Sequence, residues 1–249
     1  MLKRNNTYSN FFDFTKGKSS SFFFVCDHAS NFIPKNFNCL GLTLNDLLKH
    51  IAWDIGAKNL TLEISKKLDS CCYLSNFSRL LIDPNRAKNQ KDLIIKSSDG
   101  INIPGNKNLH KNEIQRRFVF YDSYHNNLRK ILRSKLDNNI NLKLISIHSF
   151  NKYINGRNRP NEIGLLWNKN LKLLKPLLTF FQKKNINVGN NFPYSGFHYN
   201  HTLDKHSFSN NLDNISIEIR NDLIDNKKGV DKWSEIFKIA FDSLDKAAK

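Results

Sequence analysis

The strongest constraint on the fold is a mostly apolar run at residues 142–147, dominated by leucine and isoleucine, that ends at His148 and Ser149. A short apolar run bounded by polar residues is typical of a strand buried on both faces of a sheet. Similar runs predict strands at residues 21–27, 71–75, 80–82, 163–167 and 215–219. In an open α/β sheet the carboxyl ends of the strands face the ligand, so His148 marks a candidate site.

Segments with helical spacing of apolar residues separate most of these strands. The spacing predicts a helix at 43–68, with Thr43 as its N-cap and Gly56 as a residue that can split it, and further helices at 112–136, 171–184 and 231–247. Alternating strands and helices without repeats predict a single α/β domain with a mixed, mostly parallel central sheet and helices on both faces.

The domain is expected to span residues 21–249, after a polar, irregular lead-in at 1–20. Polar stretches with glycine and proline predict loops at 87–109, 151–160 and 189–206. No apolar stretch approaches about 20 residues, so we expect no transmembrane helix. The start of the chain does not resemble a signal sequence, and a cytoplasmic protein is therefore expected.

The cysteine pattern and the charge limit the classes of function. The four cysteines contain no C-x-x-C pair, which favours free thiols over a zinc ribbon or disulfides. The net charge of +17 is compatible with nucleic-acid binding. The lysines are scattered, however, and no aromatic-interleaved motif accompanies them, so a basic solvated surface is the preferred interpretation. Such a surface also attracts small anions.

Three predicted strands place side chains used in metal chemistry at or near their ends. His28 follows the first, His148 follows the run at 142–147, and Glu218 lies on the last. Two histidines and a carboxylate can hold Zn²⁺ and leave a position for water, which is the pattern of catalytic zinc sites. A further glutamate beside the water can act as general base. The residues alone therefore predict a metallohydrolase.

Eight blocks of sequence, spread from about residue 22 to about residue 237, resemble the N-formylglutamate amidohydrolase family and occur in the family's order. They are DHASN at 27–31, HIAWDIGA at 50–57, SRLLIDPNR at 78–86, IPGN at 103–106, HSF at 148–150, RPNEIG at 159–164, NFPY at 191–194 and IEIRND at 217–222. That family is similar in fold and site to the zinc carboxypeptidases, so the resemblance implies a phosphorylase/hydrolase-like α/β fold.

The resemblance implies that His28 and His148 are zinc ligands and that Glu218 is the catalytic glutamate. In zinc carboxypeptidases a ligand glutamate follows the first histidine by three residues, but Asn31 stands at that position here. Asp54 is our candidate for the third ligand, with His50 as the alternative.

The resemblance also implies the substrate contacts. Asn85 and Arg86 correspond to an Asn-Arg pair that binds a substrate carboxylate, for which the guanidinium provides a bidentate fork. Arg79 or Arg159 can bind a second carboxylate or stabilise the oxyanion. Tyr194, in the predicted loop 189–206, can close over the substrate.

The expected activity is zinc-dependent hydrolysis of an N-formyl or N-acyl amino acid, most simply N-formyl-L-glutamate to formate and L-glutamate. One alternative is the same site acting on another small carboxylated amide or peptide. A second alternative, from a different class, is a basic nucleic-acid-binding protein without catalysis.

Overall fold

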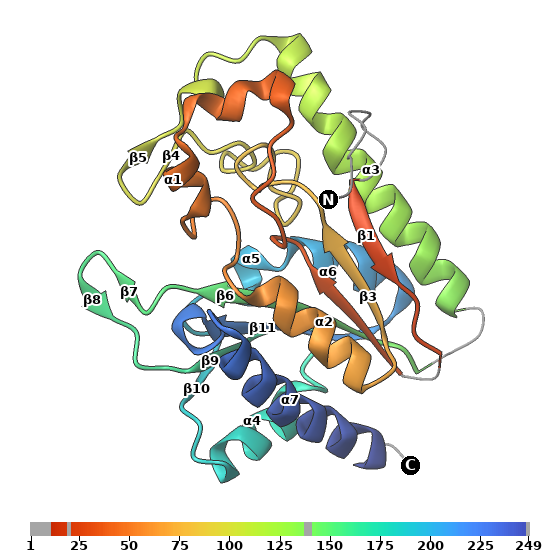
Figure 1. Cartoon of the computed structure of the whole chain (residues 1–249). Helices are drawn as coiled ribbons and strands as arrows, with labels where there is room; N and C mark the ends of the chain where they lie inside the picture. The colour runs from red at the N-terminus through yellow and green to blue at the C-terminus, as the bar shows by residue number, and fades with distance from the viewer. Residues whose placement is uncertain (1–10, 19–20, 137–140, 248–249) are drawn as a thin grey trace.

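The computed structural model describes residues 11–18, 21–136 and 141–247. Its central sheet has seven strands in the order β1-β3-β2-β6-β11-β9-β10 (Figure 1). They are β1 (Phe12–Thr15), β2 (Phe22–Cys26), β3 (Cys71–Ser75), β6 (Lys143–Phe150), β9 (Ile163–Leu166), β10 (Val188–Asn190) and β11 (Asp213–Arg220). Strands β3, β2, β6 and β11 are parallel, and β1 and β9 pair antiparallel with their neighbours β3 and β11. The predicted α/β fold with a mixed, mostly parallel sheet is confirmed.

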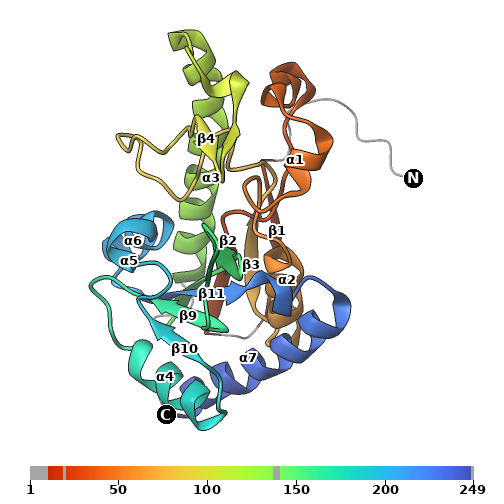
Figure 2. The same cartoon turned by 90° about the vertical axis from the view of Figure 1, so that its left-hand side faces the viewer.

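Helices cover both faces of the sheet. One apolar core lies under α2 (Ala57–Lys67), α4 (Leu174–Lys183) and α7 (Lys227–Ala247). The opposite core lies under α1 (Leu44–Leu48), α3 (Lys111–Leu136) and α6 (His201–Ser207), and Figure 2 shows α3 and α6 on the side away from α7. Because both faces are covered, all eight residues of β6 are buried, as a central parallel strand requires.

The predicted helix at 43–68 is two helices. Residues 49–56 form turns between α1 and α2, and they carry His50 and Asp54. The backbone N–H of Asp54 donates to the carbonyl of His28 at 2.9 Å, and Gly56 begins α2 with φ of 80°. A Cβ at Gly56 would lie 2.2 Å from the Ile224 carbonyl oxygen, so this close approach requires glycine. Tertiary contacts therefore interrupt the helical pattern at this point.

Other segment predictions also need correction. Residues 80–82 form no strand: residues 80 and 81 lie in a turn and Ile82 in irregular backbone, inside the 78–86 segment that follows β3. The lead-in at 1–20 is not wholly irregular, because it contains β1, which pairs with β3. Residues 1–10 and 19–20 of the lead-in lie outside the described residues. The predicted loops contain short elements: β4 (Ser97–Ser98), β5 (Ile101–Asn102), a 3₁₀ turn at Pro104–Asn106, β7 (Tyr153–Ile154), β8 (Arg157–Asn158) and α5 (Gly196–Tyr199). The predicted loop 189–206 also overlaps the end of β10 and most of α6, which were not predicted. Further 3₁₀ turns lie at Lys35–Gly41, Phe208–Asn210 and Asn221–Leu223.

The four cysteines are free thiols, as predicted, and three of them are buried. Of the helices that the structure describes, none combines the length and the apolar character that crossing a bilayer requires.

Candidate active site

A cavity of about 270 Å³ lies at the carboxyl ends of the parallel strands and brings together most of the predicted site residues. The end of β2, the segment after β3, the end of β6 and the end of β11 all contribute to it. Its lining includes the predicted residues His28, His50, Asp54, Arg79, Asn85, Arg86, His148, Tyr194 and Glu218, together with Asp83, Asp92, Ile95, Ser98, Ser149 and Tyr199. This is the edge of the sheet where ligand binding is expected.

The imidazoles of His28 and His148 meet the carboxylate of Asp54 in this cavity. Asp54 Oδ2 lies 2.9 Å from His148 Nδ1 and 3.4 Å from His28 Nδ1. One ligand atom from each of the three buried side chains lies within 4.8 Å of the others. Two imidazole nitrogens and one carboxylate oxygen are the donor set of many catalytic zinc sites, so these residues fit a metal ion.

Of the alternative third ligands, His50 lines the cavity but is not part of the ligand group, and Asn31 does not line the cavity. His50 Nδ1 is 3.8 Å from Asp54 Oδ1 and forms no hydrogen bond with the described residues, and His50 is not part of the three-residue group. Burial lowers the pKa of His50 to about 4. Asn31 does not line the cavity, and its Nδ2 donates to the Leu47 carbonyl at 2.9 Å.

A second carboxylate lies behind each of the two histidines. His28 Nε2 is 2.8 Å from Asp83 Oδ1, and His148 Nε2 is 3.3 Å from Asp27 Oδ2. A carboxylate beside one ring nitrogen favours the proton there, which leaves the other nitrogen free to bind a metal. In both rings the nitrogen that faces Asp54 is Nδ1, so both rings present to the same place the nitrogen that could bind a metal.

The carboxylates around these rings are held in their charged form. Burial alone would raise the pKa of Asp27, but the imidazole of His148, 3.3 Å away, outweighs it and lowers that pKa to about 2. For Asp54, the charges of His28 and Arg79 likewise outweigh burial and hold its pKa well below the ordinary value. In return, Asp27 and Asp54 outweigh the burial of His148 and raise its pKa. The cavity therefore favours positive charge at this point.

Glu218 is the direct neighbour of His148 across the parallel pair β6–β11. Its Oε2 is buried and forms no hydrogen bond with the described residues. Burial raises the pKa of Glu218 to about 7, against the opposing charge of His148. A carboxyl group with a pKa near neutrality can both accept and return a proton, as a general base and acid must.

Arg79 lies directly beside the histidine and aspartate group. Its Nη1 is 3.3 Å from Asp54 Oδ1 and 3.2 Å from His28 Nδ1. Its Nε and Nη2 donate to the carbonyls of Ile51 and His50, both at 3.2 Å. These contacts fix the guanidinium between the 49–56 turns and the candidate metal ligands.

Asn85 and Arg86 both line the cavity but differ in how many of their side-chain polar atoms are hydrogen-bonded within the protein. Asn85 Nδ2 donates to the Tyr199 carbonyl at 2.9 Å, and its Oδ1 accepts from the Thr202 N–H at 3.0 Å, so both ends of the amide are used within the protein. Arg86 Nε donates to Asp92 at 2.5 Å and its Nη1 to the Asn85 carbonyl at 2.9 Å. Among the described residues Arg86 Nη2 forms no hydrogen bond, and the guanidinium lies 4.9 Å from the centre of the Tyr199 ring.

Tyr194 lines the cavity, whereas Arg159 stands behind it. Arg159 Nη1 donates to the Tyr194 hydroxyl at 3.0 Å, and its guanidinium lies 4.9 Å from the centre of the tyrosine ring. The segment bearing Tyr194 packs closely on β9, because a Cβ at Gly164 would lie 2.2 Å from the Phe192 carbonyl oxygen. Arg159 does not line the cavity, and its contact with the cavity is the hydrogen bond to Tyr194, which does line it.

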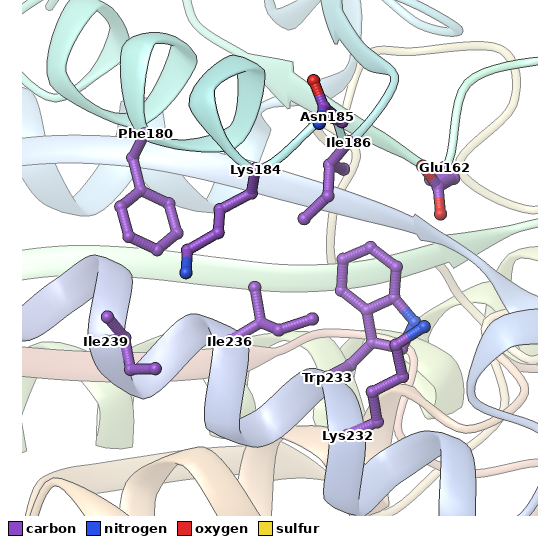
Figure 3. Close-up of a pocket in the computed structure, with 9 residues that line it drawn as sticks. All are labelled: Glu162, Phe180, Lys184, Asn185, Ile186, Lys232, Trp233, Ile236 and Ile239. Carbon is purple, nitrogen blue, oxygen red and sulfur yellow. The ribbon is translucent and has the colours of Figure 1, made fainter.

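A second cavity, of about 310 Å³, lies between α4 and α7 (Figure 3). Lys184, Lys232 and Glu162 are its charged residues, and its other lining residues are Phe180, Asn185, Ile186, Trp233, Ile236 and Ile239. It contains none of the predicted site residues.

Three comparisons with known proteins bear on the family. The model of the N-formylglutamate amidohydrolase family matches residues 20–225. Among solved structures, the gene product Atu2144 from Agrobacterium tumefaciens is 29% identical over 96% of each chain, with a TM-score of 0.88. The N-formylglutamate amidohydrolase from Ralstonia eutropha JMP134 is 16% identical over 92% of this chain and 95% of its own, with a TM-score of 0.72, which shows a shared fold. No curated protein matches the chain.

The matched range includes every residue of the cavity described above, from His28 to Glu218. The chain therefore belongs to the N-formylglutamate amidohydrolase family.

Proposed function

We propose that this protein is a zinc-dependent amidohydrolase that removes the formyl group from N-formyl-L-glutamate or a closely related N-acyl amino acid. The observation that carries the proposal is the grouping of His28, Asp54 and His148 beside Glu218 in one cavity that Arg86 also lines. The name of the Ralstonia eutropha relative supports the choice of substrate.

Nδ1 of His28, Nδ1 of His148 and the carboxylate of Asp54 would hold the metal. A Zn²⁺ ion bound there would make a neighbouring water more acidic and would polarise the carbonyl of the amide. Asp83 and Asp27 keep the two imidazoles in the tautomer and orientation that present Nδ1.

Glu218 is assigned the proton transfers. As water attacks the formyl carbon, the Glu218 carboxylate accepts one of its protons. The C–N bond then breaks, and Glu218 returns the proton to the departing nitrogen, which leaves as the amine of the amino acid. The unpartnered, buried Oε2 and the pKa of about 7 suit a group that must carry a proton in one step and release it in the next.

The arginines are assigned to the charges of the substrate and of the transition state. Arg86 donates from Nη2 to the substrate α-carboxylate, and its other nitrogens keep the guanidinium in place. Arg79, beside Asp54 and His28, stabilises the developing oxyanion. Tyr194, supported by Arg159, closes the cavity over the substrate side chain. Asn85 serves by fixing the segment that carries Arg86.

The test combines metal analysis of the purified protein with a release assay on N-formyl-L-glutamate, N-formyl-L-aspartate, N-formyl-L-leucine and N-acetyl-L-glutamate. We expect one zinc per chain and the fastest turnover with N-formyl-L-glutamate, because two carboxylates match the cationic side chains at the cavity. A protein that binds no zinc and hydrolyses none of the four compounds would contradict the proposal.

A further inference from the structure

We propose that three histidines, two of them buried, and a buried tyrosine, none of which lines the cavity, position Arg86 for the substrate carboxylate. The group consists of Tyr121 and His125 on α3 and His201 and His206 on α6, and we call it the histidine cluster. The inference rests on the proposed function, because it assigns the cluster to the carboxylate subsite of that reaction.

The cluster holds two carbonyls of the segment that carries Arg86. His125 Nε2 lies 2.9 Å from the Pro84 carbonyl oxygen, and the Tyr121 hydroxyl donates to the Arg86 carbonyl oxygen at 2.8 Å. Tyr121 and His125 are four residues apart on α3, so they lie on the same face of the helix. Together they hydrogen-bond the backbone of residues 84–86 from one side.

The histidines of α6 fix the direction of the hydrogen bonds that His125 and Tyr121 form with this backbone. His206 Nε2 lies 2.9 Å from His125 Nδ1, and His201 Nε2 lies 2.7 Å from the Tyr121 hydroxyl. Because a carbonyl can only accept, His125 Nε2 carries its proton, and a neutral His125 then accepts at Nδ1 from His206. By the same reasoning the Tyr121 oxygen accepts from His201. The arrangement requires a neutral His125, because its Nδ1 must accept, whereas His201 and His206 only donate from Nε2.

The surroundings keep these imidazoles neutral. Burial, followed by the charge of Lys205, lowers the pKa of His201 to about 4 and that of His206 to about 3. Burial and the two neighbouring histidines also hold the pKa of His125 well below its ordinary value. The hydrogen bonds deduced from the geometry are therefore those of the neutral cluster.

The same segment is held from α6 through Asn85. Thr202 donates its N–H to Asn85 Oδ1 at 3.0 Å, and its hydroxyl donates to Asp27 Oδ1 at 2.7 Å. Residues 84, 85 and 86 are thus each bonded to α3 or to the α5–α6 segment. Because Arg86 Nη1 also bonds the Asn85 carbonyl, the position of the guanidinium depends on where this backbone lies. A shift of residues 84–86 would move Arg86 Nη2, whereas His28, Asp54 and His148 lie on other segments of the chain.

The experiment compares His125→Leu, which removes both ring nitrogens, with His125→Gln, whose amide can still donate to the Pro84 carbonyl. For His125→Leu we expect the KM of the best substrate to rise roughly tenfold while kcat stays within about threefold of the wild type. Zinc content should not change. In His125→Gln the KM should stay close to the wild-type value. His110→Leu, at the exposed start of α3, is the control and should match the wild type.

A KM that does not change in His125→Leu, or a loss confined to kcat, would overturn the proposal. Tyr121→Phe is the milder second variant, because it removes only the hydroxyl between Arg86 and His201, and it should raise KM in the same way.

Hydrogen exchange over residues 83–92 gives a readout that needs no substrate. The amides of Asp83, Asn85 and Arg86 are hydrogen-bonded within this segment or to Leu93, and they should exchange faster in both variants. If no substrate is hydrolysed yet exchange rises, the proposed function fails and the positioning of the segment stands. If exchange is unchanged in both variants, the inference fails whatever the activity.

Discussion

Asp83 Oδ1 lies 2.8 Å from His28 Nε2, on the edge of the imidazole opposite the nitrogen that faces Asp54. A carboxylate in this position fixes the tautomer of a histidine ligand and increases its basicity. We therefore expect Asp83→Asn to weaken zinc binding by about 10- to 100-fold, although Asp83 is not itself assigned to the metal. A zinc titration against a competing chelator measures the change.

Asp92→Asn is the matched control for that titration. Asp92 lines the same cavity, but its carboxylate bonds Arg86 and its side chain is 45% exposed. It should keep the wild-type affinity for zinc. Equal losses in the two variants, or no loss in Asp83→Asn, would mean that Asp83 does not support His28.

The third metal ligand can be decided by a pair of substitutions. Asp54→Asn should lose stoichiometric zinc, because an amide oxygen is a poorer zinc ligand than a carboxylate and Asp54 is the oxygen donor of the group. His50→Gln should retain zinc, because His50 faces Asp54 at 3.8 Å without belonging to the group. Metal analysis after dialysis distinguishes them, and the reverse pattern would assign the ligand to His50.

Arg86→Ala should raise KM much more than it lowers kcat. Loss of a charge-assisted hydrogen bond to the substrate carboxylate predicts a rise in KM of roughly 10- to 100-fold. Steady-state kinetics on the best substrate measure both constants. Lys184→Ala, in the cavity between α4 and α7, should leave them unchanged. If Arg86→Ala leaves both constants at their wild-type values, Arg86 does not bind the carboxylate.

The histidine cluster should make stability depend on pH. The pKa of His206 is about 3 in the folded protein against an ordinary value of 6.5, so at intermediate pH only the unfolded chain binds this proton. Its contribution to stability is present above about pH 6.5 and is lost as the pH falls toward about pH 3. The charges of Lys205, Arg129 and His201 add to the effect of burial, Asp27 opposes it, and His125 contacts the ring directly at 2.9 Å.

We therefore expect the free energy of unfolding to fall less steeply with acid in His206→Leu than in the wild type. Urea titrations at several pH values between these limits measure the slopes. His110→Leu, at the exposed start of α3, should keep the wild-type slope. Parallel slopes in wild type and His206→Leu would show that His206 is not held neutral by the fold.

The sheet could be predicted from the sequence because its parallel strands are buried on both faces and therefore appear as apolar runs. His28, His148 and Glu218 could be placed near one edge for the same reason. β1 was missed, although Phe12 and Phe14 alternate with polar residues as an edge strand often does.

The rest of the site depends on contacts between residues that are far apart in the chain. Asp54 lies in turns where the apolar spacing indicated a helix, because its carboxylate bonds the N–H of Ser149 at 3.2 Å. The resemblance implied that Asn85 binds substrate, but its side-chain oxygen accepts a hydrogen bond from the N–H of Thr202, 117 residues away. Asp83 was part of a recognised block, yet no local pattern indicates which histidine it contacts. His125, His201 and His206 had no local signal at all.

The most direct test of the account is the turnover of Glu218→Gln with zinc bound. The substitution keeps the shape of the side chain and removes its ability to accept a proton. We expect kcat to fall roughly 100- to 10,000-fold while zinc content and KM stay close to the wild type. A zinc-loaded Glu218→Gln protein with a kcat within about threefold of the wild type would contradict the central claim that Glu218 transfers the proton.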